Sequence, residues 1–101
     1  MTRGTFEVLA LVKTAVDNKP VDSYVQVYLL SGELVYKTFT VMDQHNVAVE
    51  NVEAELFLHV PNLQLNLDNT IRCLNDNSRW RIIKIFPRAK DTLLWVARSS
   101  N

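Results

Sequence analysis

The stretch that decides the fold is Val52-Glu53-Ala54-Glu55-Leu56-Phe57-Leu58-His59-Val60. Its odd-numbered members are charged, aromatic or imidazole side chains, and its even-numbered members are all aliphatic. Successive side chains of a β-strand point to opposite faces of the sheet, so this period of two predicts a strand with one buried face. We therefore expect a half-buried strand over residues 52–60.

The same alternation recurs along the chain, separated by polar turn sequences. It predicts further strands over Thr5–Val16, Val21–Leu30, Thr70–Leu74, Arg79–Phe86 and Thr92–Arg98, with an additional alternation at Leu63, Leu65 and Leu67. Turns are expected at residues 17–20, 75–78 and 87–91, which are rich in Asp, Asn and Pro. The prediction is an all-β fold: a small β-barrel or sandwich of about six or seven short antiparallel strands.

Three features of the middle of the chain complete this prediction. Both faces of Val21–Leu30 carry large side chains, so both are expected to be partly covered. Ser31-Gly32-Glu33 is expected to break that strand, and the irregular pattern of Glu33–Met42 leaves a strand and a short helix open. The segment Tyr36–Glu50 is predicted to be one longer internal loop.

Length and composition bound the class of protein. A chain of 101 residues, 48% apolar and 22% charged, predicts a single globular domain over residues 1–101. No apolar run approaches the roughly 18 residues that a membrane span needs, and no secretory signal is evident. The single cysteine, Cys73, excludes an intramolecular disulfide.

The net charge is zero, but the charges are divided along the chain. Residues 1–69 carry four basic and nine acidic side chains, and residues 70–101 carry seven basic and two acidic ones. Two interpretations stay open. The opposite charges pair with copies of the chain or with neighbouring proteins, or the fold brings the two parts together and they offset each other.

No catalytic motif is present in the sequence. It lacks a glycine-rich phosphate loop, a nucleophile elbow and a paired-histidine zinc motif. His45 is expected to be solvated, His59 to lie on a sheet face, and Cys73 to be a buried thiol. Glu53 and Glu55 share one strand face, which is more typical of a solvated or interface face than of a hydrolase pair. We expect no enzyme, no metal and no cofactor.

A basic and aromatic run in the last third allows a second function. Arg79, Trp80, Arg81 and Lys84 are suited to single-stranded nucleic acid, which small OB-like or SH3-like modules bind by stacking and phosphate neutralisation. Strand periodicity also allows Trp80 and Ile82 to face the core, with the two arginines outside.

The order of features in the C-terminal third resembles the closing meander of a known family. Thr70-Ile71-Arg72, a polar turn, Trp80-Arg81-Ile82-Ile83-Lys84-Ile85, a basic turn and Leu93-Leu94-Trp95 follow one another as in the head-closure, or stopper, proteins of tailed bacteriophages. Upstream, Val25–Glu33 and Val52–Val60 resemble two earlier strands of that family. The resemblance covers roughly residues 5–98.

The resemblance implies a virion structural protein of the phage neck, at the head–tail junction. Such a protein forms a closed ring of about six or twelve copies. It docks beneath the portal and its adaptor, retains packaged DNA without sequence-specific recognition, and offers a surface to a tail-terminator or other tail protein. No membrane contact is implied. A tail-terminator or tail-completion ring protein is the alternative within the same context.

Two sets of candidate residues follow. The candidate channel-facing loop, residues 36–50, is represented by Tyr36, Lys37, Asp43, Gln44, His45, Asn46 and Glu50. The candidate interface with another subunit or partner comprises the charged residues Glu53, Glu55, Arg79, Arg81, Lys84, Arg88 and Arg98.

Overall fold

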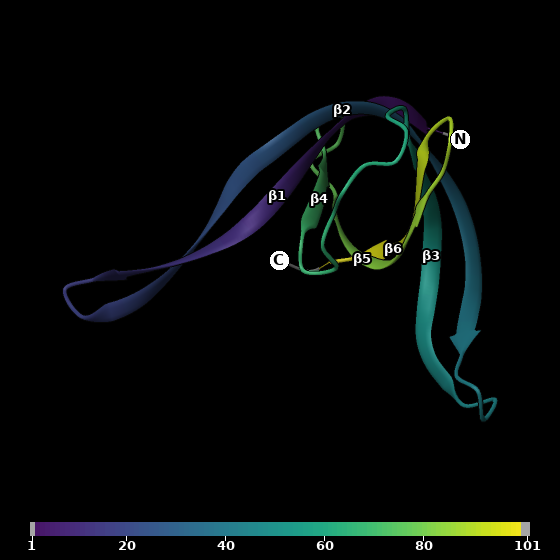
Figure 1. Ribbon diagram of the computed structural model, residues 1–101, viewed down its shortest axis with the longest axis horizontal. Helices are drawn as coiled ribbons and strands as arrows, with labels where there is room; N and C mark the ends of the chain where they lie inside the picture. Colours follow the sequence, from purple (N-terminus) through teal and green to yellow (C-terminus); the bar gives the residue numbers. More distant parts are fainter. Residues whose placement is uncertain (1, 100–101) are drawn as a thin grey trace.

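A computed structural model describes residues 2–99 of the chain, and its strands close into a barrel (Figure 1). The strands are β1 (Thr2–Val16), β2 (Lys19–Met42), β3 (Ala48–Leu58), β4 (Thr70–Cys73), β5 (Arg79–Pro87) and β6 (Thr92–Arg98). Their order around the barrel is β1-β2-β3-β6-β5-β4, and every neighbouring pair is antiparallel. Residues 2–99 contain no helix, so the predicted all-β fold is confirmed.

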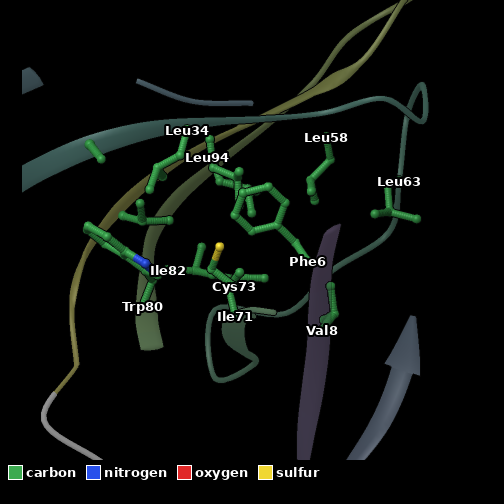
Figure 2. Close-up of a cluster of buried hydrophobic side chains, with 13 residues drawn as sticks. Phe6, Val8, Leu34, Leu58, Leu63, Ile71, Cys73, Trp80, Ile82 and Leu94 are labelled. Carbon is green, nitrogen blue, oxygen red and sulfur yellow. The ribbon is translucent and has the colours of Figure 1, made fainter. Parts of the chain in front are cut away.

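The core fills the inside of the barrel with one face of each strand. Figure 2 shows Phe6 from β1 and Leu34 from β2 among buried side chains of the other strands. The alternation in residues 52–58 gives β3 four fully buried side chains, Val52, Ala54, Leu56 and Leu58. The predicted burial of Cys73 is confirmed, and of the two interpretations left open for Trp80 and Ile82 the structure has the one in which they face the core.

The turn between β1 and β2 is the tightest in the chain. Asp17 and Asn18 have φ values of 53° and 63°, the left-handed region that a two-residue type I′ hairpin requires at both positions. Asp and Asn tolerate this region better than other non-glycine residues. The turn was therefore predictable, although Lys19 and Pro20, which were also expected in it, begin β2.

The expected break at residues 31–33 is wrong, because β2 runs through it without interruption. Gly32 pairs with Gly4 of β1 and with Leu58 of β3. A Cβ at Gly32 would lie 2.7 Å from the carbonyl oxygen of Phe57 and 3.2 Å from the ring of Phe6. The glycine thus permits close approach of the neighbouring backbone rather than a turn.

The predicted internal loop over residues 36–50 is also corrected. Residues 36–42 belong to β2 and residues 48–50 to β3, so that only 43–47 form a turn between them. The reason is that strand pairing, with shifts in register after Tyr36 and Val41, overrides an irregular local pattern.

The alternation at Leu63, Leu65 and Leu67 does not form a strand. Residues 59–69 connect β3 to β4, and Leu63 and Leu65 pack against the core while Leu67 is exposed. The buried Thr92 holds this segment to β6: its hydroxyl accepts a hydrogen bond from Leu63 N at 2.9 Å and donates one to Val60 O at 2.8 Å.

Replacing the two glycines with alanine tests the close approach at residue 32. We expect Gly32→Ala to lower the free energy of unfolding by about 1–3 kcal/mol, because a backbone oxygen blocks the new methyl group. Gly4→Ala is the matched control. Its Cβ would meet the side-chain amide of Asn75, which can rotate away at the cost of the exposed hydrogen bond that it accepts from Thr5 N. Urea denaturation should therefore show the larger loss for Gly32→Ala, and equal losses would contradict this account.

Candidate interaction surface on two hairpin arms

Two hairpins leave the barrel, and they are the most exposed parts of the chain (Figure 1). The first arm comprises residues 10–29 of β1 and β2. On β1 it begins after Leu9, the last residue paired with β4, and on β2 it ends before Gly32, the first residue paired with β3. The second arm, residues 37–53, begins after the Tyr36–Ala54 pair. The ladder between β3 and β6 also ends at Ala54, so the arm has no third strand beside it. In each arm the ladder is a two-stranded ribbon.

The first arm exposes an unusual amount of apolar surface. Its exposed large side chains, at 36–55% of their full area, are Leu11, Val12, Val16, Val21, Tyr24, Val25, Val27, Tyr28 and Leu29. The expectation that both faces of residues 21–30 are partly covered is thus wrong for this chain alone, since only Leu30 is half-buried. A ribbon of two strands cannot bury either face by itself.

Cross-strand pairing sorts the first arm into two faces. Directly opposite residues share a face, so Val12, Val25 and the Thr14–Val21 pair lie together. This face carries β-branched side chains and ends at the Val16–Lys19 pair beside the turn. It is the larger continuous uncharged surface of the arm.

The second arm ends in a turn that its own polar groups close. The carboxylate of Asp43 accepts hydrogen bonds from His45 N at 2.8 Å and Val47 N at 3.0 Å. Asn46 has a φ of 60°, and its N–H bonds to the carbonyl of Asp43. Gln44 is exposed within the same turn. Of the candidate channel residues, four therefore form one compact polar tip.

The base of the second arm is fastened to the outside of the barrel. Phe39 contacts Trp95 edge-on, with ring centroids 4.8 Å apart, and Phe86 also contacts Trp95, with centroids 4.7 Å apart. Lys84 lies over Phe86 and Trp95 at 5.2 and 5.7 Å. Such aromatic pairs and cation–π contacts each add stabilisation beyond simple burial. Of the three remaining channel candidates, Lys37 and Glu50 form ion pairs. Tyr36 lies at the arm's origin, and its ring is 6.0 Å from that of Trp80.

An ion pair joins the second arm to β5. The Arg81 guanidinium donates to the carboxylate of Glu50. This hydrogen bond, followed by the attraction of the positive charge, holds the pKa of Glu50 below its ordinary value. Both groups are largely solvated, so the contact orients the arm more than it stabilises the fold.

The seven charged residues predicted as an interface all make contacts within the chain. Glu53 accepts from Arg98 N at 3.2 Å, and Glu55 accepts from Trp95 Nε1 at 3.2 Å and pairs with Lys37 at 3.7 Å. The other contacts are Arg79 over Tyr24, Arg81 with Glu50, Lys84 over Trp95, Arg88 with Asp91, and Arg98 over Trp80.

The division of charge along the sequence is partly offset inside the fold. Glu7 pairs with Arg72 at 3.2 Å and Glu50 pairs with Arg81, and each pair joins the acidic part of the sequence to the basic part. These two pairs offset part of the charge division, and pairing of the remaining charges with other copies or with neighbouring proteins stays a prediction. Beside these charges, the apolar first arm is a further candidate interface.

The basic and aromatic run of β5 does not form a stacking platform. Trp80 is 1% exposed and its indole N–H donates to Ser78 Oγ at 2.9 Å. Arg79 and Arg81 point away from it, toward Tyr24 and Glu50. The aromatic group that does lie outside the barrel, Phe39, Phe86 and Trp95, comes from three strands, so sequence spacing could not identify it.

The remaining candidates form no reactive site among residues 2–99. His59 is exposed and lies 3.9 Å from Glu33, His45 is in the second turn, and Cys73 is buried. Over that range no group of three metal-binding side chains and no pocket is found. Nor does the described part of the chain contain an apolar helix of membrane-spanning length.

The pKa of Glu50 offers a direct test of the contact that orients the second arm. We expect Arg81→Gln to raise the pKa of Glu50 toward the ordinary value of 4.5, because the guanidinium that favours the carboxylate is gone. Carboxyl-resolved NMR titration measures it. In the unchanged protein this contact contributes to folding stability at pH values above the ordinary pKa of a glutamate. That contribution is lost as the pH falls through the lowered pKa of Glu50. Arg79→Gln is the control and should leave Glu50 unchanged.

Comparison of the chain with protein-family models, with curated proteins and with solved structures found no match.

Proposed function

We propose that this chain is a structural subunit of the bacteriophage neck, a ring-forming head-closure protein that docks beneath the portal and its adaptor. The observation that carries the proposal is the first arm, which projects from a closed barrel with its apolar side chains exposed. The resemblance of residues 5–98 to stopper proteins supplies the context. In this role the chain has no catalysis and no cofactor of its own.

In a single copy of the chain, the apolar side chains of the first arm are left uncovered. Contiguous exposed apolar surface on a soluble protein marks a surface that a partner covers. The arm's valines and tyrosines would gain the most from that contact, since each fully buried large side chain contributes about 1.5–3 kcal/mol. Closed symmetry lets one such surface be covered in every copy, as in a ring.

The second arm is the proposed channel-facing element. Its tip, residues 43–46, is held by local hydrogen bonds and touches no part of the barrel core. A segment with few buried contacts can change position at little cost in free energy. Its polar side chains are suited to the boundary of a water-filled channel through which DNA passes without being read.

Cryo-electron microscopy of purified particles that carry the chain tests this proposal. We expect a closed ring of this chain at the head–tail junction, with the portal adaptor on one side and tail protein on the other. A ring in contact with the tail tube alone would assign the chain as a tail terminator instead. Absence of the chain from the particle would overturn the neck assignment.

A pair of variants tests the role of the first arm in the same particles. Val25→Lys places a charge on the apolar face, and we expect its incorporation to fall by at least tenfold. Leu67→Lys is the matched control, because Leu67 is also exposed, at 59% against 47% for Val25, but belongs to neither arm. Immunoblotting of particles gives the measurement. Equal incorporation of both variants would exclude the arm as the contact.

A further inference from the structure

We infer that the first arm of one copy adds as a β-ribbon to the second arm of the next copy, through the unpaired edge of β2 in each. This inference rests on the proposed ring and identifies the contact that closes it.

The observation behind the inference is that β2 presents free strand edges on both sides of the barrel. Residues 19–30 pair with β1 only, because the ladder with β3 starts at Gly32. Residues 37–42 pair with β3 only, because the ladder with β1 ends at Leu34. Within residues 2–99 the other edge of each segment has no strand beside it, and its backbone N–H and C=O groups are open to a further strand.

The chemistry of the two edges matches. Ser23–Leu30 is a run of eight residues without charge, proline or glycine. Edge strands of monomeric proteins are normally protected by such residues, and here Lys19, Pro20 and Asp22 protect only the end near the turn. Thr38–Met42 is likewise uncharged, whereas the opposite edge of the second arm carries Glu50 and Glu53. An uncharged strand added to Thr38–Met42 buries no unpaired charge.

The size of the first arm fits an interface between copies. It contains twenty residues, and each partner of a stable interface contributes roughly 20–30. The main-chain hydrogen bonds would fix the register, and the exposed aliphatic side chains would supply the buried area.

The placement of the arms makes the contact head-to-tail. Figure 1 shows the first arm leaving the barrel at the left and the second arm descending at the right. Each copy therefore donates on one side and accepts on the other. Contacts between unlike surfaces propagate from copy to copy and close into a ring when the rotation allows. Pairing of two first arms would stop at a dimer and leave every second arm bare.

Cysteine cross-linking in purified particles tests the contact. The native Cys73 is buried and stays in place. Val27→Cys marks the first arm and Thr38→Cys the second, and both positions are exposed. After a short bis-maleimide, we expect the double variant to give a ladder of dimers, trimers and higher species on a denaturing gel. Either single variant alone should remain monomeric.

Three outcomes would overturn the inference. Dimers from Val27→Cys alone would show that two first arms pair with each other. An equal ladder from the control pair Leu67→Cys and Thr38→Cys would show unspecific proximity. Particles that contain the chain but give no ladder would refute the arm contact and leave the proposed ring intact. Absence of the chain from particles would refute the proposed function itself. If either cysteine variant fails to enter particles, Leu29→Cys with Met42→Cys replaces the pair.

Discussion

At Gly32, β2 gains β3 as a second neighbour while it is still paired with β1, and the rest of the structure depends on this close passage. A side chain here would collide with the carbonyl oxygen of Phe57, so the three strands could not approach one another around Phe6 and Leu58. That approach is what turns a long hairpin into a closed barrel with a sealed interior. Both arms are the parts of β1, β2 and β3 that extend beyond this junction.

The two arms differ in how far the chain itself stabilises them. The second arm is fastened by the Phe39–Trp95–Phe86 contacts and by Arg81 on Glu50. The first arm meets the barrel at Arg79, whose guanidinium carbon lies 6.0 Å from the centroid of the Tyr24 ring. Local stability follows buried contacts. The first arm therefore depends most on a neighbouring molecule for its order, which agrees with a role in assembly.

Much of the fold was predictable because a period of two is a strong local signal. The burial of Val52, Ala54, Leu56, Leu58 and Trp80 follows directly from it. The turn at Asp17-Asn18 follows instead from the tolerance of Asp and Asn for positive φ. The continuity of β2 was not predictable, because a glycine that permits close packing and a glycine that ends a strand look the same in sequence. Most of the second arm has no clear strand signal in the sequence, because its register shifts disturb the alternation. The candidate site was predicted less well, since charge along a sequence does not reveal which charges the fold will pair.

The continuity of β2 has a mechanical consequence. A strand of 24 residues would span roughly 80 Å if straight, yet the longest dimension of the molecule is 45 Å. The strand is therefore strongly curved, and its two ends belong to different arms. Because one continuous strand joins the two arms, a change in the curvature of β2 would change the direction of one arm relative to the other.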